Sequence, residues 1–293
     1  MSRIAYVNGR YVPHKVAQVH VEDRGFQFAD SVYEVCEVFH GQIVDMVRHL
    51  DRLSRSLSEL SIRWPVKRRA MEAILKEVIV RNRVTTGLVY VQVSRGAARR
   101  DFHFPAPGTL PTLVVTSRSI PRATKAKATA EGIRVITTPD IRWERVDIKT
   151  TAMTAQVLAK EAAMRAGAKE ALMVDREGRV TEGSSSTAWI VDGEGTLVTR
   201  PKDMGILPGI TRMAVMDYAA ANGIKVDERP FTVEEALRAR EAFVTSASAT
   251  VTAVVQIDDT VIGNGRPGSI VTGMREAFHV NVEKQPLRHY LTA

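Results

Sequence analysis

The sequence predicts a mixed α/β protein with two domains. Stretches of alternating apolar and polar residues, which are typical of strands, are interspersed with stretches whose apolar residues recur at helical spacing. The 293 residues fit two domains of roughly 100–200 residues each. Hydrophobic residues make up 44% of the chain and charged residues 25%, both ordinary for a folded globular protein. Disorder is therefore not expected.

Residues 1–118 are expected to form a small N-terminal α/β domain. Asn8 and Gly9 stand between apolar residues and indicate a hairpin, because both turn positions accept a positive φ. An amphipathic helix is predicted by the apolar stripe of Leu50, Leu53, Leu57 and Leu60. A second helix is expected over 68–82, and strands over 32–39, 43–45, 88–94 and 113–116.

Residues 119–126 are expected to link the two domains, since the chain there is polar, basic and interrupted by a proline. A larger C-terminal domain over 127–293 follows. Its strands are expected at 132–137, 171–175, 188–192, 242–246 and 251–257. Its helices are expected from about residue 155, from 209 to 222, from a capped start at Thr232, and over 270–282.

The charge of the chain suggests an anionic partner. Its formal net charge is +8, with an isoelectric point near 9.7. The basic residues are scattered, however, and we find no zinc-finger spacing, recognition-helix signature or aromatic ribonucleoprotein motif. Nucleic-acid binding would explain only the charge. A small molecule that carries a phosphate or a carboxylate is the better expectation.

Cysteine usage and hydropathy predict a cytoplasmic protein. Cys36 is the only cysteine, so no disulfide can form within the chain, which fits a reducing compartment. The sequence has no apolar run of about 18 residues and no signal-like N-terminal segment, so a membrane location is not expected. We expect no metal.

One stretch, Asp140 to Thr151, has the pattern expected of a reactive lysine. Val146 and Ile148 alternate with Asp147 and Lys149, as along a strand, and a helical pattern begins soon afterwards. Lys149 would therefore lie where a strand gives way to a helix. A lysine held there can be partly withdrawn from water, which makes a neutral amine available as a nucleophile.

Three further features are individually weak but fit the same ligand. Gly209-Ile210-Thr211 at a helix start resembles an anion site, because free amides and the helix dipole face a bound phosphate there. Glu182 lies in a turn-like, serine-rich run, and Arg52 lies off the leucine stripe, where its local pattern favours a solvated face. A lysine for an aldehyde, a carboxylate for a pyridinium and these groups for a phosphate together indicate pyridoxal 5'-phosphate.

The same motifs resemble those of the class IV aminotransferases, which are fold-type-IV pyridoxal-phosphate enzymes. The resemblance covers nearly the whole chain and rests on three runs of sequence: Asp147-Ile148-Lys149-Thr150, Val180 to Ser186, and Leu207 to Arg212. It implies a two-domain fold with the cofactor at the domain interface, and a homodimer.

The resemblance also implies roles for individual residues. Lys149 would bind the cofactor covalently and later move a proton between the substrate and the cofactor. Glu182 would pair with the pyridine nitrogen and keep the ring an electron sink. The phosphate would be bound by the group Arg52, Ile210, Thr211, Ser246 and Ser248. Leu207 would pack on the ring, and Ser185 would contact the ring or its hydration.

Within this family, the run Tyr33 to Val38 is similar to the D-amino acid aminotransferase pattern, in which the tyrosine lies near the substrate. Arg100 matches an arginine that binds the substrate α-carboxylate from the partner subunit. Phe102 stands where a histidine is usual, with His103 one position further on. The resemblance therefore implies transfer of an amino group from a D-amino acid, such as D-alanine or D-glutamate, to a 2-oxo acid such as 2-oxoglutarate.

Two other departures concern the cofactor side of the pattern: Ala247 occupies a place where a hydroxyl is common, and Thr187 a place where asparagine is usual. Two related activities stay open as alternatives. One is branched-chain L-amino acid aminotransferase activity, although Tyr33 replaces the phenylalanine usual there. The other is aminodeoxychorismate lyase activity, which uses the same cofactor for elimination.

Overall fold

A computed structural model describes residues 3–121, 130–203 and 205–283 of the chain. It divides into two compact units, which we describe separately. Unit 1 comprises Met1–Pro121 and Ile148–Ala152, and unit 2 comprises Arg122–Asp147 and Met153–Ala293. Lys149 thus belongs to unit 1, although it is distant in sequence from the rest of that unit. The linker predicted at 119–126 falls mostly on residues 122–129, which lie outside the described residues.

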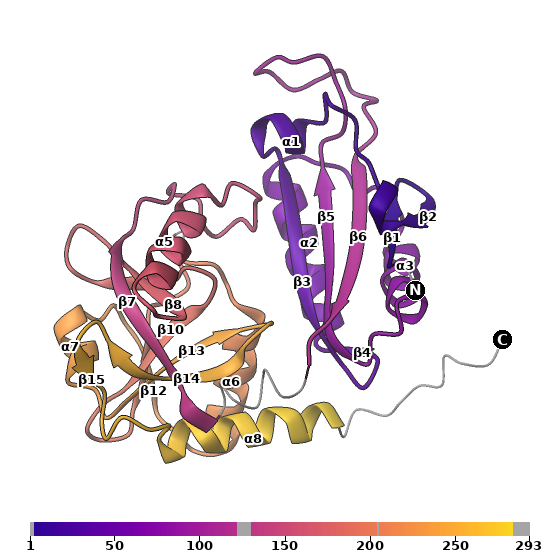
Figure 1. Cartoon of the computed structure of the whole chain (residues 1–293). Helices are drawn as coiled ribbons and strands as arrows, with labels where there is room; N and C mark the ends of the chain where they lie inside the picture. Colours follow the sequence, from indigo (N-terminus) through magenta and orange to yellow (C-terminus); the bar gives the residue numbers. More distant parts are fainter. Residues whose placement is uncertain (1–2, 122–129, 204, 284–293) are drawn as a thin grey trace. The chain divides into compact units, whose positions relative to one another are not determined.

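Unit 1 is built on one antiparallel sheet with the strand order β2-β1-β6-β5-β3-β4 (Figure 1). Its strands are β1 (Ile4–Val7), β2 (Arg10–Pro13), β3 (Ser31–Phe39), β4 (Gln42–Ile43), β5 (Thr86–Ser94) and β6 (Thr112–Ser119). The hairpin predicted at Asn8-Gly9 is confirmed, because Val7 and Arg10 pair across that turn. The long strands β3 and β5 pair along their whole length.

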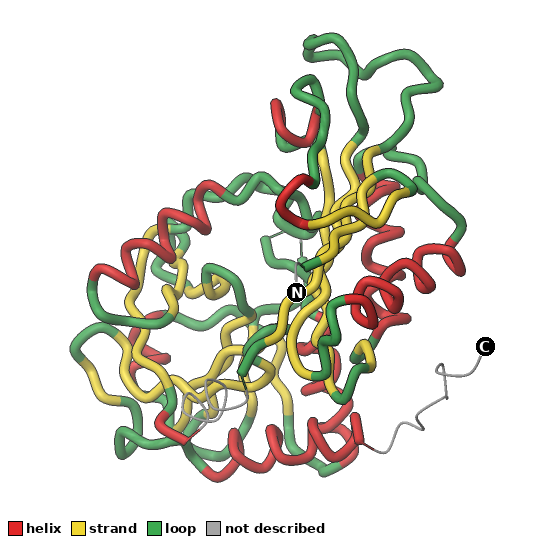
Figure 2. The backbone as a smooth tube through the Cα atoms, turned by 45° about the vertical axis from the view of Figure 1, so that its right-hand side comes forward, coloured by secondary structure: helices red, strands yellow, loops and turns green. Residues whose placement is uncertain are grey.

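The helices of unit 1 are η1 (His14–Val16), α1 (Arg24–Phe28), α2 (Met46–Glu59) and α3 (Arg68–Arg81). The leucines of α2 and the apolar residues of α3 share one core with the buried face of the sheet. Figure 2 shows these two helices running along the strands. The two predicted helices are confirmed, whereas α1 was not predicted.

Unit 2 contains a larger sheet with the order β12-β11-β10-β13-β14-β7-β8-β9, with β15 paired to β14 (Figure 1). The strands are β7 (Ile133–Pro139), β8 (Glu170–Val174), β9 (Val180–Gly183), β10 (Thr187–Val191), β11 (Leu197–Thr199), β12 (Val226–Glu228), β13 (Glu241–Ser246), β14 (Thr250–Ile257) and β15 (Thr260–Val261). The five predicted strands of this part are confirmed to within a few residues.

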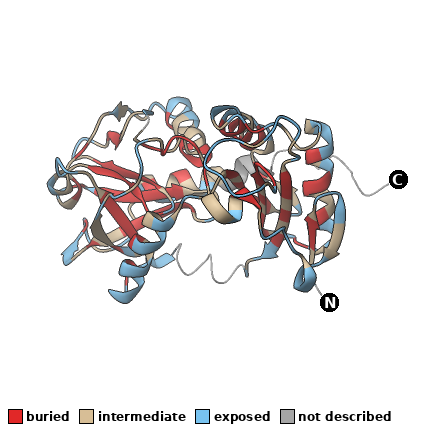
Figure 3. Cartoon of the chain, turned by 90° about the horizontal axis from the view of Figure 1, so that it is seen from above, coloured by how far each residue is buried: buried red, intermediate tan, exposed pale blue. Residues whose placement is uncertain are grey.

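The helices of unit 2 that lie wholly within the described residues are α5 (Thr154–Arg165), α6 (Ile210–Ala221), α7 (Val233–Leu237) and α8 (Ser269–Glu283). The sheet has cores on separate faces: α6 and α8 pack around Trp189 and Phe243, and α7 packs on a second cluster. The strands β8 to β11, β13 and β14 are mostly buried, whereas β7, β12 and β15 are partly or fully exposed (Figure 3). The predicted capping box is confirmed, since Thr232 and Glu235 each bond the other's backbone N–H.

The stretch around Lys149 differs from its prediction. Strand β7 ends at Pro139, and the residues up to Lys149 form turns and irregular backbone rather than a strand. The expected alternation is also wrong, because Asp147 is buried together with its neighbours Val146 and Ile148. Extended pairing here is limited to a bridge between Val32 and Thr150, so the segment gains its order from β3 and not from a strand of its own.

Candidate active site

Lys149 is fixed through its backbone to the beginning of β3. Its carbonyl accepts the N–H of Tyr33 at 3.0 Å, and its own N–H lies 3.3 Å from the hydroxyl of Ser56 on α2. Two positions later, the N–H of Thr151 donates to the carbonyl of Ser31 at 3.1 Å. The hydroxyls of Ser31 and Thr151 also share a short hydrogen bond. The lysine backbone is therefore held on both sides.

The side chain of Lys149 lies over an aromatic ring. Its Nζ is 4.3 Å from the centroid of the Tyr33 ring, which lies 5.6 Å from the ring of Tyr90. An ammonium over a ring face is attracted by the negative charge of that face. Lys149 is half-buried. The structure thus brings two of the predicted site residues, Lys149 and Tyr33, into direct contact.

Arg52 is buried in unit 1, so the solvated position favoured by its local pattern is wrong. It is 8% exposed and donates twice to Glu34, at 2.7 Å from Nε and 2.8 Å from Nη2. His49, one turn earlier on α2, lies 2.7 Å from the same carboxylate. Burial disfavours the ionised carboxylate, but the Arg52 charge and these hydrogen bonds outweigh it and lower the pKa of Glu34 to about 2.

Glu182 on β9 is buried and held from two sides. Its Oε2 accepts a hydrogen bond from Nη1 of Arg142 at 2.6 Å and another from the backbone N–H of Leu207 at 3.1 Å. The carboxylate is 5% exposed. A buried carboxylate with a guanidinium against it remains ionised, because the opposite charge offsets the lost hydration. In unit 2 the structure therefore joins two predicted site residues, Glu182 and Leu207.

The beginning of α6 is suited to an anion. Its N-cap is Gly209, which has no side chain to cap the first amides of the helix. The next residues, Ile210 and Thr211, are buried in the first turn. Any side chain at Gly209 would lie 2.9 Å from the hydroxyl of Thr187, which accounts for glycine there. Uncapped amides at the positive end of a helix bind phosphate readily.

The serine run after Glu182 serves another carboxylate. The hydroxyls of Ser184, Ser185 and Ser186 all donate to Glu170 on β8, with the last two at 3.0 and 3.2 Å. Glu170 is buried, so these donors replace its lost hydration. Ser185 was expected to contact the cofactor ring or its hydration, and that contact stays a prediction.

Ser246 and Ser248 lie at the end of β13. Their hydroxyls are 3.2 Å apart, and the hydroxyl of Ser246 accepts the N–H of Ala249 at 3.1 Å. The loop is thus ordered by its own hydroxyls, while Ala247 between them offers none. The binding of a phosphate by these two serines stays a prediction.

The basic loop after β5 is anchored at its first residue. Arg95 is buried, not solvated as its place in a basic loop suggests, and its guanidinium bonds both oxygens of Asp30, at 2.7 and 2.9 Å. Arg24 on α1 bonds the same carboxylate at 2.8 Å and the carbonyl of Asp101 at 2.7 Å. Burial opposes ionisation of Asp30, but the two guanidinium groups lower the pKa of its carboxyl overall.

Beyond this anchor, the loop presents Arg100 and His103 on the surface. The Arg100 guanidinium lies 5.1 Å from the centroid of the Phe28 ring and 5.9 Å from that of Phe102. His103 is exposed and pairs with Asp101 at 3.1 Å. Phe102 is therefore within cation–π distance of the arginine. The structure does not bring His103 to the Arg100 guanidinium through any contact that it records.

Sequence reasoning missed four charged residues that hold the predicted ones in place: Glu34, His49, Asp140 and Arg142. Glu34 had a usable signal, since it lies on the apolar face of β3 and a buried carboxylate needs a cation. Asp140 and Arg142 are two residues apart, and both the backbone N–H and the guanidinium of Arg142 donate to the Asp140 carboxylate. Their partner, Glu182, is distant in sequence and gave no local signal.

Known proteins similar to this chain are aminotransferases. The sequence profile of the family described as amino-transferase class IV matches residues 31–257. The chain belongs to the class IV aminotransferases. It is 36% identical over 275 residues to a D-alanine aminotransferase of Bacillus licheniformis, covering 94% of this chain and 95% of that relative. It is 33% identical to a D-alanine aminotransferase of Staphylococcus aureus, strain MSSA476, covering 96% and 99%.

Solved structures place this aminotransferase in the same fold. A branched-chain amino acid aminotransferase from T.th., with pyridoxamine 5'-phosphate, superposes with a TM-score of 0.87 at 27% identity, over 96% of this chain and 94% of that one. An Escherichia coli branched-chain amino acid aminotransferase superposes with the same TM-score, 0.87, at 23% identity, with the same coverage. The latter supports the fold alone. The predicted fold type is confirmed.

Proposed function

We propose that this aminotransferase moves the amino group of a D-amino acid, such as D-alanine or D-glutamate, to a 2-oxo acid such as 2-oxoglutarate, with pyridoxal 5'-phosphate as its cofactor. The relatives that match it over nearly their whole length are D-alanine aminotransferases. The structural observation that most supports the proposal is Lys149, whose backbone is hydrogen-bonded to β3 and whose side chain lies beside Tyr33.

The groups present fit this cofactor. An aldehyde requires an amine, a pyridinium requires a carboxylate and a phosphate requires donors; the chain offers Lys149, Glu182 and the uncapped start of α6. When bound, the cofactor supplies a ring that accepts the electron pair left when a proton leaves the substrate Cα. The chain's own residues bind the ring, set its charge and move that proton.

Lys149 is proposed to bind the cofactor aldehyde and later to carry the proton. Its backbone is held by Tyr33 and Thr151 on β3, so its side chain begins from a fixed point. Its Nζ would hold the aldehyde of the cofactor and would accept the proton from the substrate Cα when its nitrogen is free as an amine. A fixed backbone matters because proton transfer requires the amine within hydrogen-bond reach of the carbon.

Glu182 is proposed to pair with the ring nitrogen. Arg142 and the Leu207 N–H fix its carboxylate, which as an anion favours a protonated ring. A protonated ring withdraws electrons more strongly and so stabilises the negative charge that develops as the proton leaves. Leu207 is proposed to pack on the ring.

The phosphate is proposed to lie at the start of α6, against Ile210 and Thr211, with Arg52, Ser246 and Ser248 as further donors. The α6 amides have no side-chain cap. The guanidinium of Arg52 has a fixed orientation, because two of its nitrogens donate to Glu34. This orientation would suit it to bind the phosphate. A guanidinium has five N–H donors in a rigid fork, so a carboxylate and a phosphate can share it.

The substrate is proposed to meet Tyr33 and, from the partner subunit of a homodimer, Arg100 with help from His103. An α-carboxylate is best bound by a guanidinium fork. The anchor at Asp30 and the stacking of Arg100 on Phe28 set the direction of the loop. We expect the enzyme in the cytoplasm, in keeping with the single, buried Cys36. The described residues include no helix long and apolar enough to cross a membrane.

A panel of D- and L-amino acids with 2-oxoglutarate tests the proposal. Turnover of D-alanine or D-glutamate, accompanied by the absorbance change of the bound cofactor, is expected. Turnover confined to L-leucine, L-isoleucine and L-valine would support the branched-chain alternative, which the likeness to the T.th. structure favours. Pyruvate release from aminodeoxychorismate without an acceptor would support the lyase alternative.

A further inference from the structure

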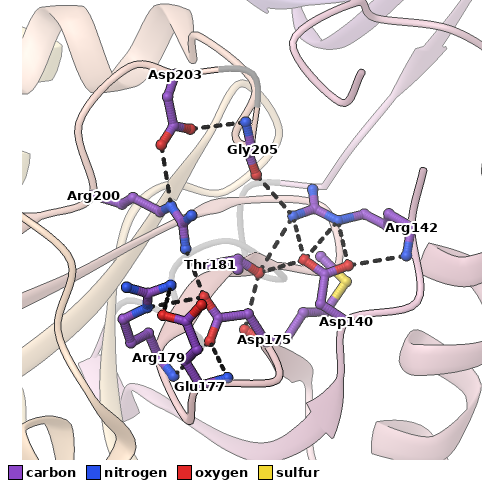
Figure 4. A network of polar contacts seen from close by, with 10 residues as sticks. Asp140, Arg142, Asp175, Glu177, Arg179, Thr181, Arg200, Asp203 and Gly205 are labelled. Atoms are coloured by element: carbon purple, nitrogen blue, oxygen red, sulfur yellow. Dashed lines mark hydrogen bonds and ion pairs between the residues drawn. The ribbon is translucent and has the colours of Figure 1, made fainter. Parts of the chain in front are cut away.

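Arg142 belongs to a network of polar contacts in unit 2 (Figure 4) and lies on the buried side of that network. Its side chain is 5% exposed and contacts two carboxylates: Glu182 at 2.6 Å from Nη1, and Asp140 at 2.9 Å from Nε and 2.7 Å from Nη2. The hydroxyl of Thr181 lies 3.3 Å from Nη2, and the carbonyl of Gly205 lies 3.4 Å away. One guanidinium thus joins a loop, a strand and a second loop.

Asp140 braces Arg142, which means that its carboxylate holds the Arg142 guanidinium in one orientation. Its carboxylate receives the two side-chain contacts from Arg142, the backbone N–H of Arg142 at 3.0 Å and the hydroxyl of Thr181 at 2.6 Å. A fork bound by two parallel hydrogen bonds has little freedom to rotate. The nitrogen that points to Glu182 is therefore held in one direction by Asp140.

The same network holds the loop that contains Leu207. The Gly205 N–H donates to Asp203 at 2.8 Å, and Asp203 lies 3.6 Å from Arg200 (Figure 4). Arg200 in turn bonds Asp175 at 3.1 Å. Two arginines therefore contact the loop, Arg142 at the Gly205 carbonyl and Arg200 at the Asp203 carboxylate. The loop then delivers the Leu207 N–H to Glu182.

Three charged side chains lie together around Glu182. Asp140 and Glu182 each carry −1 and Arg142 carries +1, so the three sum to −1. Buried charges are stable only when they are paired. A protonated ring nitrogen adds +1 and brings the group to zero, whereas a neutral ring leaves the group at −1. Arg142 therefore fixes the position of the Glu182 carboxylate and also contributes to the net charge around it.

We propose that Arg142, braced by Asp140, is a positioning residue that fixes the Glu182 carboxylate and the Leu207 loop for the ring nitrogen of the cofactor; this inference rests on the proposed role of Glu182. The ionisation of the group agrees with it. Burial opposes charge on both partners, yet their mutual hydrogen bonds lower the pKa of Asp140 and raise that of Arg142. Arg142 acts through Glu182 and has no chemical step of its own.

The test uses the full chain with Arg142→Met, compared with Arg179→Met as a matched control. Arg179 also pairs with two carboxylates of this network, Asp175 and Glu177, whereas the Glu182 carboxylate is bonded by Arg142. The dissociation constant of pyridoxal 5'-phosphate is measured for each apoprotein. The absorbance of the bound cofactor is then followed from about pH 5 to 9, a range that brackets the titration of a carboxyl whose pKa burial has raised. Thermal unfolding of the apoproteins shows that they fold.

Arg142→Met is expected to raise the dissociation constant at least about tenfold, because a charge-assisted contact is lost and Glu182 is released. It should also add a pH-dependent change in cofactor absorbance, since a buried carboxylate without its cation titrates at higher pH. Arg179→Met should match the wild type in both. Equal effects of the two variants, or wild-type behaviour of Arg142→Met, would overturn the proposal.

Two further variants keep the outcome decisive. If Arg142→Met does not fold, Asp140→Asn removes the brace and changes the charge sum from −1 to 0; its dissociation constant should rise several-fold, and a wild-type value would overturn the proposal. Glu182→Gln distinguishes the proposed role of Glu182 from the positioning role of Arg142. If Glu182→Gln changes affinity and spectrum while Arg142→Met does not, only the positioning role fails. If neither changes them, the proposed role of Glu182 fails as well.

Discussion

The carbonyl of Lys149 accepts the backbone N–H of Tyr33 at 3.0 Å, and the Lys149 Nζ lies 4.3 Å from the centroid of the Tyr33 ring. The lysine and the tyrosine are thus fixed to one another by backbone and side chain together. Residues Ile148–Ala152 belong to unit 1 for this reason, although the chain on both sides of them belongs to unit 2. The following predictions concern the groups around this pair.

Glu34→Gln should destabilise unit 1 by about 3 kcal/mol, because it removes the charge that pairs with the buried Arg52. The free energy of unfolding, measured by urea denaturation of the apoprotein, checks this. Glu72→Gln is the control, since Glu72 forms a distant, partly exposed contact with Arg68 at 3.9 Å. Its expected effect is below about 0.5 kcal/mol. Equal losses in the two variants would contradict a special role for the buried pair.

The stabilisation by Glu34 should depend on pH in a defined direction. Its pKa of about 2 in the folded chain lies below the usual value of about 4.3 in an unfolded chain. The contribution is therefore fully present above the unfolded value and is lost as the pH falls through about 2. The difference in unfolding free energy between wild type and Glu34→Gln should shrink from pH 5 to pH 2. A difference that grows toward acid would refute the assignment.

Arg52→Lys should weaken cofactor retention. Lysine keeps the charge that Glu34 requires but lacks the fork that can bind a carboxylate and a phosphate together. Loss of a charge-assisted contact costs about 1.5–3 kcal/mol, or roughly ten- to a hundredfold in affinity. Dialysis followed by measurement of bound cofactor checks this. Retention equal to that of the wild type, in a variant that unfolds normally, would remove Arg52 from the phosphate site.

Arg100→Ala should raise the Michaelis constant for D-amino acids by at least about tenfold and leave the cofactor spectrum unchanged, because one charged donor to the α-carboxylate is lost. Arg99→Ala, at the neighbouring exposed position, is the control. His103→Ala should have a smaller effect, since its ring faces Asp101. A shifted cofactor spectrum in Arg100→Ala would instead place this residue at the cofactor.

A subunit-mixing experiment tests whether Arg100 acts across a dimer. Arg100→Ala and Lys149→Ala subunits are each expected to be inactive or weak alone. Mixed dimers should recover part of the activity, because one of their two sites would contain both residues. Absence of recovery in dimers shown to have exchanged subunits would place Arg100 in its own subunit's site or outside any site.

Local patterns predicted most of the fold because strands and helices have their own periodicities. The strand expected over 32–39 was correct, and so was the capped start at Thr232. Arg52 shows the limit of this reasoning: its position off the leucine stripe indicates solvent, but Glu34 from a distant strand makes its burial favourable. A helical stripe carries no information about a partner on another element.

The site was predicted less completely, for a similar reason. Lys149 and Glu182 could be proposed from the sequence because the motifs around them are local, and their roles stay predictions. Arg142 lies in the same stretch as Lys149, yet its partner on β9 is far away in sequence, so no pattern assigns it to Glu182. The order around Lys149 also comes from β3 and not from a strand of its own, which alternation along the chain could not indicate.

The central claim is that Lys149 binds the cofactor, and borohydride reduction tests it most directly. The holoenzyme is reduced and digested, and the pyridoxyl-modified peptide is sequenced by mass spectrometry; Lys149→Ala is treated in parallel. The account predicts one modified peptide, with the label on Lys149, and neither label nor turnover in the variant. Label on another lysine of the wild-type chain, or an unchanged adduct in Lys149→Ala, would contradict it.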